Sequence, residues 1–339
     1  MSPSASGRRV LAAPDKFRGT LTAEEAAQAI AAGAAQAGWA CEELPLADGG
    51  EGTLEVLGGA NRMTWVSGPL GIPVEAPWRL EGTAAVIEMA RASGLLLAGG
   101  RDQNDPLRAS TQGTGELIAA AAGAGARELV VAVGGSATTD GGRGALEALA
   151  GLIPFPEHGL DVRVACDVAT EFVDAARVFA PQKGATEPQV LRLAERLQTL
   201  AAAYAERFGV CVEELAGAGA AGGLAGGLAA AGARLERGFD VVAELVGLDP
   251  ALVAADLVIT GEGMLDETSF AGKVVGGVLE RARSYGVDVF AVVGAAAENT
   301  GGRIPHASLV ARFGHERAMN DTAACVAVLV EERLRRTNS

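Results

Sequence analysis

Cysteine, histidine and aromatic residues are scarce in this chain. Its four cysteines lie far apart and form no Cys-x-x-Cys pair, which argues against a structural zinc site or a disulfide scaffold and favours a reducing cytoplasm. The three histidines lie outside the loops described below, so each is expected to be structural or exposed. Aromatic residues make up 4% of the chain and hydrophobic residues 49%, so Ala, Val and Leu must supply the core of a globular protein.

Several familiar signatures are also missing. No apolar run approaches the roughly 20 residues of a membrane-spanning helix, and the first ten residues have no signal-peptide core. No repeat recurs with a period of about 20 to 50 residues. The absence of a Gly-x-Ser-x-Gly elbow and of a Cys/His pair disfavours acyl transfer through a nucleophile. The absence of Gly-x-Gly-x-x-Gly counts against a nicotinamide-dependent oxidoreductase.

Acidic residues outnumber basic ones by 42 to 28, which gives a net charge of −14. Such a surface repels nucleic-acid phosphates and anionic membranes, so neither is an expected partner. An anionic small-molecule substrate would need a local basic pocket.

The pattern along the chain predicts an α/β fold. Strand-like runs alternate with helical patterns near both ends and around residues 110–135, as in parallel sheets with crossover helices. In the first helix, residues 22–38, Thr22 is expected to be the N-cap, with Glu25 in the capping-box position. Residues 64–90 are punctuated by Pro and Gly and predict antiparallel strands of a different subdomain.

Two further segments complete this prediction. Residues 188–209 are expected to form a long amphipathic helix with an apolar face made by Val190, Leu191, Leu193, Leu197 and Leu200. Residues 215–238 consist mainly of Gly, Ala and Leu. They are expected to pack closely rather than serve as a linker, because a linker of this composition would expose apolar surface.

The stretch Leu129–Gly144, LVVAVGGSATTDGGRG, is the first candidate for a functional loop. An apolar strand ends there in glycines, hydroxyls and Asp140 ahead of a helical run. Beyond the carboxyl end of a parallel strand, loop amides and a helix N-terminus favour an anion. The stretch is not a Walker loop, and an ordinary strand-to-helix turn is an alternative of equal weight.

The loop Pro45–Thr53, PLADGGEGT, is the second candidate. It holds Asp48 and Glu51 among glycines, and one or two carboxylates together with substrate oxygens suit Mg²⁺. A solvated turn is the alternative.

The loop Thr260–Lys273 is the third candidate, and it offers Glu262, Asp266 and Lys273. An acid can accept a hydroxyl proton, and a lysine can neutralise a phosphoryl group in transfer. Capping of a helix N-terminus is the alternative for the two acids. Two further segments carry charged residues that could bind an anionic substrate. They are APDKFRG, with Asp15, Lys16 and Arg18, and FAPQKGA, with Lys183, although basic residues are often only surface charges. Together these loops favour carboxylate-based phosphoryl transfer.

Many of these motifs occur in the same order in one family. They are APDKFRGTLTAEEAA, LADGGEGT, SGPLGIPVEAPW, IEMARASGL, STQGTGELI, VGGSATTDGGRG, ACDV, FAPQKGA, GAGAAGG and DLVITGEGMLDETSFAGK. On these residues the chain resembles the bacterial glycerate kinase family, of the type that includes the glyoxylate-pathway enzymes.

The resemblance implies an α/β protein of two domains with the active site in the cleft between them. One domain would be flavodoxin-like with a parallel sheet, formed by residues 8–63 and 245–335. The other, residues 64–244, would be a smaller inserted domain of mixed α/β structure.

The resemblance also implies ATP-dependent phosphorylation of D-glycerate with Mg²⁺, at the 2-hydroxyl to give 2-phosphoglycerate, in a cytoplasmic monomer or homodimer. Phosphorylation at the 3-hydroxyl stays open. The site residues expected from the loops and the resemblance are Asp15, Asp140, Lys183, Asp266 and Lys273 for catalysis; Gly113, Thr114, Gly134, Gly135, Ser136 and Thr138 for the nucleotide; Arg18, Asp48 and Glu262 for the substrate; and Asp48 and Glu51 for the metal.

The chain departs from the usual family pattern in three places. Residues 15–20 read Asp-Lys-Phe-Arg-Gly-Thr where the family usually has Asp-Ser-Phe-Lys-Gly-Ser, so Arg18 keeps a positive charge that is not equivalent to lysine. Thr139 replaces an asparagine, and the segment after Val168 is shorter than usual. These changes leave open a non-catalytic relative, or one that accepts another small hydroxy acid or binds a phosphorylated metabolite.

Overall fold

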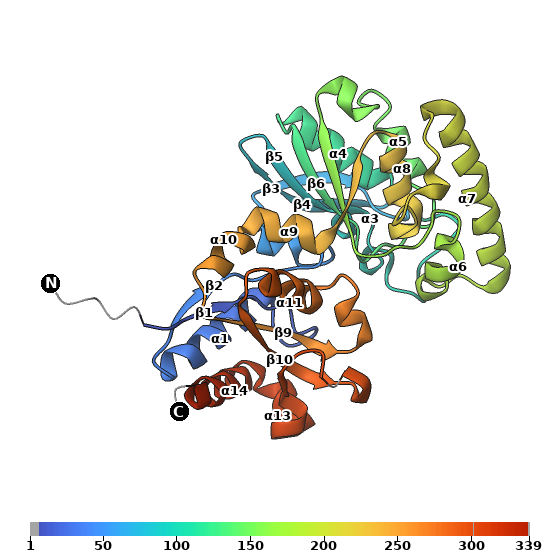
Figure 1. Ribbon diagram of the computed structural model, residues 1–339. Coiled ribbons are helices and arrows are strands. Elements are labelled where there is room, and N and C mark those ends of the chain that lie inside the picture. Colours follow the sequence, from blue (N-terminus) through green and yellow to red (C-terminus); the bar gives the residue numbers. More distant parts are fainter. Residues whose placement is uncertain (1–6, 301, 338–339) are drawn as a thin grey trace. The chain divides into compact units, whose positions relative to one another are not determined.

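The computed structural model describes residues 7–300 and 302–337 (Figure 1). They divide into two compact units. One, here called the discontinuous unit, comprises the described residues up to Asp48 and those from Phe239 onward; the other, the central unit, is Gly49–Gly238. Both junctions fall earlier in the chain than the boundaries expected at residues 63/64 and 244/245, and the central unit, expected to be the smaller, is the longer of the two.

The discontinuous unit is built on a five-stranded parallel sheet of order β2-β1-β9-β10-β11. Its strands are β1 (Arg9–Ala12), β2 (Ala40–Glu43), β9 (Leu257–Leu265), β10 (Asp288–Ala296) and β11 (His306–Ser308). Counted along this unit alone, the order is 2-1-3-4-5, which is the flavodoxin-like order. The central unit is inserted into the connection between the second and third of these strands.

Helices cover both faces of this sheet, with α1 and α14 on one side and α11 on the other (Figure 1). The helices of the unit are α1 (Ala23–Gln36), α9 (Gly238–Val246), α10 (Leu248–Val253), α11 (Val274–Ser284), α12 (Leu309–Phe313), α13 (His315–Asn320) and α14 (Thr322–Thr337). Thr22 caps α1 and Glu25 completes the capping box, as predicted. Ile30 of α1 and Val330 of α14 are buried in one apolar cluster with Val10 and Ile259 of the sheet.

The central unit is built on a six-stranded sheet of order β3-β4-β5-β6-β7-β8. Its strands are β3 (Arg62–Ser67), β4 (Pro73–Glu81), β5 (Ala84–Glu88), β6 (Glu128–Ala132), β7 (Asp161–Cys166) and β8 (Arg234–Arg237). The pairs β3–β4 and β4–β5 are antiparallel and the remaining pairs are parallel, so the antiparallel strands predicted over residues 64–90 are confirmed.

The helices of the central unit are α2 (Thr53–Val56), α3 (Ala90–Ser93), α4 (Gln112–Gly123), α5 (Arg143–Ala148), α6 (Ala175–Phe179), α7 (Glu187–Phe208) and α8 (Leu224–Ala230). Apart from the short α2, they contribute to one large core. The long helix α7 buries Leu193 and Leu197 as expected, but Leu191 is 57% exposed, because its position on the helix turns away from the face that these two leucines share. The predicted close packing of the Gly/Ala-rich segment is confirmed, since Leu224 and Leu228 are fully buried.

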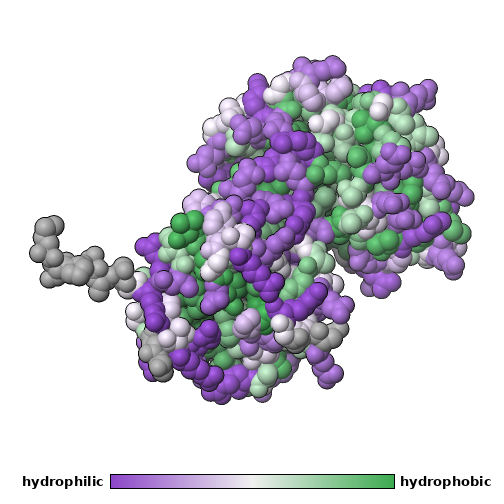
Figure 2. All heavy atoms as spheres, in the orientation of Figure 1, coloured by the Kyte–Doolittle hydropathy of each residue, from purple (hydrophilic) through white to green (hydrophobic). Residues whose placement is uncertain are grey.

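Figure 2 shows hydrophilic residues spread over the visible face of each unit, with smaller apolar patches among them. Within the described ranges, no helix combines the length and the apolar character needed to cross a bilayer.

Candidate functional site

A cavity of about 520 Å³ lies in the discontinuous unit, among residues that follow β1 and those at the ends of β9 and β10. In an open α/β sheet, ligands bind beyond the carboxyl ends of strands where the strand order reverses, and here that point lies between β1 and β9. The charged residues that line the cavity are Asp15, Lys16, Arg18, Asp48, Glu262, Asp266 and Lys273. The fold therefore gathers most of the candidates from the two ends of the chain.

Asp15 is placed by continued pairing of the chain beyond β1. Its backbone amide donates to the carbonyl of Gly261 at 2.9 Å. Its carboxylate, 7% exposed as a residue, accepts from the Lys16 amide at 2.7 Å and lies 3.6 Å from the Lys16 ammonium. Burial raises the pKa of Asp15 to about 6; the charge of Lys16 opposes this rise, and that of Asp48 adds to it.

Glu262 lies on β9, because this strand extends to Leu265 and so includes the first residues of the loop expected over Thr260–Lys273. The residue is 7% exposed, and its Oε1 is buried without a hydrogen-bond partner. Burial raises the pKa of Glu262 to about 7, opposed by Ser269 and Lys273 and reinforced by Asp15 and Asp266. A buried carboxyl with a pKa near neutrality can exchange a proton with a ligand.

Asp266 and Lys273 belong to the turn that connects β9 to α11. Asp266 caps the 3-10 turn Glu267–Phe270, accepting from the amide and the hydroxyl of Thr268 at 2.8 and 2.6 Å. The hydrogen bond from the Thr268 hydroxyl is the largest cause of a lowered pKa at Asp266, so this carboxylate stays ionised. Lys273 Nζ donates to the same hydroxyl at 2.7 Å. Asp266 therefore has the hydrogen bonds of a helix N-cap, which was the alternative to a role in catalysis.

The metal pair expected from the sequence is divided between the two units. Asp48 lines the cavity of the discontinuous unit, whereas Glu51 belongs to the central unit and is exposed. Among the described residues, no group of three or more His, Cys, Asp or Glu side chains is placed to hold a metal ion. Mg²⁺ usually keeps waters and phosphate oxygens and needs only one or two carboxylates, so the Asp15 and Asp48 carboxylates of the cavity fit its donor chemistry.

In the central unit, the glycine loop that contains Glu51 is held by an acid that sequence reasoning missed. Glu88, at the end of β5, is 2% exposed. Its Oε1 accepts from the amides of Gly52 and Leu54, both at 2.9 Å, and its Oε2 pairs with Arg91 Nε at 3.0 Å. The one signal in the sequence is an acid that ends an otherwise apolar strand.

The loop after β6 packs directly on this glycine loop. A Cβ at Gly134 would lie 2.8 Å from the Cα of Gly50, so a glycine at position 134 permits backbone-to-backbone contact. Gly135 accepts from the Leu95 amide at 2.9 Å through its carbonyl. Close packing alone therefore explains Gly134.

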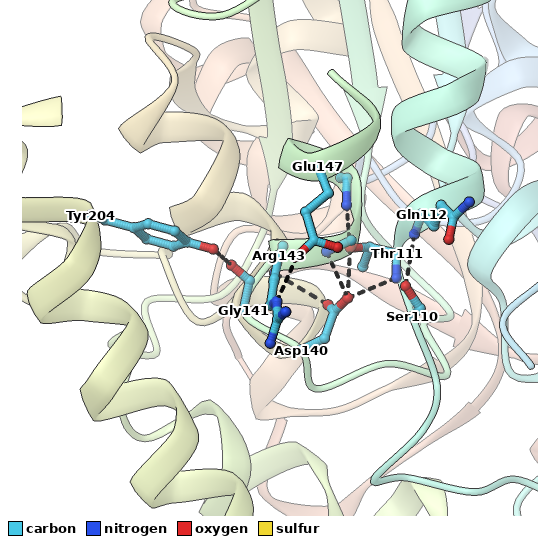
Figure 3. Close-up of polar contacts among 11 residues, drawn as sticks. Ser110, Thr111, Gln112, Asp140, Gly141, Arg143, Glu147 and Tyr204 are labelled. Atoms are coloured by element: carbon cyan, nitrogen blue, oxygen red, sulfur yellow. Dashed lines mark hydrogen bonds and ion pairs between the residues drawn. The ribbon is translucent and has the colours of Figure 1, made fainter. Parts of the chain in front are cut away.

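Asp140 ties this loop to the starts of two helices (Figure 3). Its Oδ2 accepts from the amide and the hydroxyl of Thr111 at 2.8 and 2.9 Å and from the Gly144 amide at 3.2 Å. Its Oδ1 accepts from the Gly142 amide at 3.2 Å. The hydroxyl of Tyr204 on α7 donates to the neighbouring Gly141 carbonyl at 2.9 Å. Both Asp140 oxygens are therefore engaged in holding the loop.

Lys183 also holds this loop, through a hydrogen bond to its backbone. It is 3% exposed, and its Nζ donates to the Thr138 carbonyl at 2.6 Å. Burial lowers the pKa of Lys183 to about 7, against the attraction of Asp140. The hydroxyl of Thr139, at the position where the family usually has asparagine, is buried without a hydrogen-bond partner.

The remaining nucleotide candidates have little or no exposed surface. Thr114 is fully buried and shares a hydrogen bond with Ser93 at 2.8 Å. Thr138 is fully buried and reaches the Ala221 carbonyl at 3.4 Å, while Ser136 is buried except for a small exposed fraction. A Cβ at Gly113 would collide with the Ser67 carbonyl oxygen. Packing accounts for these side chains in the structure.

His315, expected to be structural or exposed, is exposed but also lines the cavity of the discontinuous unit. It comes from the short helix α13, with Met319 on the same helix and Met264 on β9 nearby in the lining. No local pattern in the sequence marks these residues, because only the fold brings α13 to the ends of β9 and β10.

Comparison with known proteins gives one consistent result. A family model described as "Glycerate kinase family" matches residues 10–154 and 153–337. The chain is 38% identical to the glycerate 2-kinase of Escherichia coli K12, over 86% of this chain and 87% of the relative. It is 39% identical to a glycerate kinase of Bacillus subtilis 168, over 88% of each. A crystal structure from Salmonella typhimurium LT2, provisionally named glycerate kinase 2, matches with a TM-score of 0.82 and 32% identity over 98% of both chains.

Proposed function

The chain belongs to the glycerate kinase family and is therefore a phosphotransferase; from this premise we propose that it transfers the terminal phosphoryl group of ATP to the 2-hydroxyl of D-glycerate, with Mg²⁺. The observation that carries the proposal is the cavity at the ends of β1 and β9, where two acids with raised pKa values lie among three cations. The name of the Escherichia coli relative supports the 2-hydroxyl as the acceptor.

Glu262 is the proton acceptor in this proposal. Its unpartnered, buried Oε1 lies on a residue that lines the cavity, and its pKa of about 7 leaves a useful fraction ionised at neutral pH. As the glycerate oxygen bonds to the γ-phosphorus, the bond from that phosphorus to the β–γ bridging oxygen breaks and ADP leaves. The hydroxyl proton passes to Glu262. The sequence had placed Asp15, Asp140 and Asp266 among the catalytic residues and Glu262 with the substrate, so this proposal gives Glu262 a different role.

The cations of the cavity stabilise the anions of the reaction. Lys273, Lys16 and Arg18 line the same space as Glu262 and supply positive charge to the glycerate carboxylate and the phosphoryl oxygens. Arg18 can bind a carboxylate through two parallel N–H donors. The replacement of the usual Lys by Arg at this position is therefore compatible with acceptor binding.

Asp15 and Asp48 would hold Mg²⁺. Their mutual repulsion contributes to the raised pKa of Asp15, and a divalent cation between two such carboxylates would relieve it. When bound, the ion neutralises charge on the phosphate oxygens.

We assign Asp140 and Lys183 to positioning the loop that carries Gly134, Gly135, Ser136 and Thr138. Both side chains are committed to hydrogen bonds with the chain itself. We propose that the backbone of this loop contacts a phosphoryl group, as the sequence pattern suggested, while its hydroxyls contribute to packing.

Phosphorus NMR of a reaction with D-glycerate, ATP and Mg²⁺ tests this proposal. The expected result is the appearance of 2-phosphoglycerate together with ADP. Accumulation of 3-phosphoglycerate would overturn the choice of hydroxyl, and the absence of glycerate-dependent ATP consumption would overturn the proposed activity as a whole.

A further inference from the structure

The cavity of the discontinuous unit has an apolar part that the proposed chemistry leaves unused. The acids and cations come from β1, β9 and the segments that follow them, whereas apolar side chains come mainly from α12 and α13. The apolar residues of this part are Met264, Leu309, Val310, Ala318 and Met319, and Phe17 and Ala295 also line the cavity.

Two of these side chains are exposed although they are large and apolar. Met264 is 52% exposed and Met319 is 45% exposed, whereas Leu309 beside them is fully buried. Apolar surface gathered in a concave site with a few polar groups is typical of a ligand pocket. The unbranched, polarizable thioether of methionine adapts well to the face of a flat ring.

The size of the cavity calls for a ligand larger than the acceptor. Its volume of about 520 Å³ falls within the range of pockets that hold drug-sized ligands, and a three-carbon acid fills only a small part of such a space. The other substrate of a kinase is a nucleotide, which joins a flat, largely apolar base to a polyanion. The cavity offers apolar side chains to the base, and Lys16, Arg18 and Lys273 to the phosphates.

His315 adds a polar group to the apolar part. The side chain is exposed and lines the cavity, and within the described part of the chain its imidazole makes no hydrogen bond. A neutral imidazole offers one donor and one acceptor, which suits the polar edge of a nucleobase.

We propose that this part of the cavity binds the nucleobase of the phosphoryl donor, with Met264 and Met319 against the ring and His315 at its edge. The phosphates then extend toward Lys273 and Arg18. This inference rests on the proposed kinase function, and it places the nucleoside in the discontinuous unit. Thr114, which the sequence suggested as a nucleotide contact, has no exposed surface to offer.

The test compares ADP with tripolyphosphate, which carries the polyanion without the base. Calorimetric titration of Met319→Gln is expected to give about tenfold weaker ADP binding, with tripolyphosphate binding unchanged. The substitution is neutral, so it does not act on the phosphates through charge. The matched control is Met63→Gln, since Met63 is a similarly exposed methionine on β3, at 54%, and should leave both affinities unchanged.

The kinetic readout is a rise in KM for ATP in Met319→Gln, with KM for D-glycerate within about twofold of the parent value. Unchanged ADP affinity, or equal losses for ADP and tripolyphosphate, would overturn the nucleobase site even if glycerate is phosphorylated. If the parent protein shows no turnover but binds ADP in a manner that depends on Met319, the proposed reaction fails and the nucleobase site stands.

Discussion

Buried carboxylates lie in or just beyond the last part of strands in both units, but their hydrogen-bond partners differ. In the central unit, Asp140 and Glu88 each accept backbone amides and hold loops in place. In the discontinuous unit, Glu262 keeps one oxygen without a partner, and Asp15 accepts from the amide of the next residue. Burial alone therefore does not distinguish the acid that we propose as catalytic from the acids that hold loops, and we distinguish them by their hydrogen-bond partners.

The reason is energetic. N–H donors to a carboxylate stabilise its ionised form, although at Glu88 burial outweighs them and raises the pKa. A buried carboxyl oxygen without a donor carries a desolvation cost, which favours the protonated form of the group. The comparison predicts that substitutions in the two units affect different properties, activity in one and stability in the other.

The largest effect is expected for Glu262→Gln. The amide cannot accept the hydroxyl proton, so kcat for glycerate phosphorylation should fall by about 10²- to 10⁴-fold, while the melting temperature stays close to that of the parent. Steady-state kinetics and thermal unfolding measure both. Glu267→Gln, at an exposed acid on the adjoining turn, is the control and should keep full activity. A loss of stability in place of activity would place Glu262 with the structural acids.

Asp140→Ala should act chiefly on stability. It leaves the Thr111 and Gly144 amides without their acceptor, and one buried group left unpaired costs about 1–3 kcal/mol, so we expect a loss of about 3 kcal/mol. Denaturant unfolding measures it, with Asp102→Ala at an exposed loop position as the control. A variant as stable as the parent but inactive would show that Asp140 acts in the chemistry itself.

Two glycines of α4 test whether close packing determines the residues of this helix in the central unit. A Cβ at Gly113 would collide with the Ser67 carbonyl, so Gly113→Ala should cost about 1–3 kcal/mol. Gly123, on the same helix, has open space around it, and Gly123→Ala should stabilise the protein by about 0.5–1 kcal/mol. Denaturant unfolding of both variants tests this. If Gly113→Ala left stability intact and weakened only nucleotide binding, the packing explanation would be wrong.

A smaller effect concerns the pH dependence of stability. The pKa of Glu262 rises from 4.5 to about 7 on folding, so its neutral form is favoured in the folded protein. The stability that Glu262 contributes is complete below the unfolded value and is lost as pH rises through about 7. Glu262→Gln removes this dependence, so its melting temperature relative to the parent should be a few degrees higher at about pH 8 than at about pH 5. A constant difference between the two proteins would contradict the raised pKa.

Local patterns in the sequence predicted much of the fold. Thr22 and Glu25 marked the start of α1, and the Pro/Gly punctuation of residues 64–90 marked antiparallel strands. Each of these two signals depends only on residues that are close together in the sequence. The extension of β9 to Leu265 was not predicted, because it depends on pairing with β10, which only the fold supplies. The exposure of Leu191 was missed although helix geometry alone turns this position away from the face of Leu193 and Leu197.

The sequence predicted which residues form the candidate site better than it predicted their roles. Asp15, Arg18, Glu262 and Lys273 were named from the sequence, and the structure brings them to one cavity. The sequence placed Asp140 with the catalytic residues and Glu262 with the substrate. It could not show that Asp140 is engaged by the chain itself, because that depends on hydrogen bonds between distant residues, such as the one from Thr111 to Asp140.

The pH profile of kcat/KM for D-glycerate tests the central assignment most directly. We expect the rate of the parent protein to rise with pH as Glu262 loses its proton, with an inflection near its pKa of about 7, and we expect Glu262→Gln to lack this inflection. A Glu262→Gln variant that keeps both the inflection and the parent rate would contradict it.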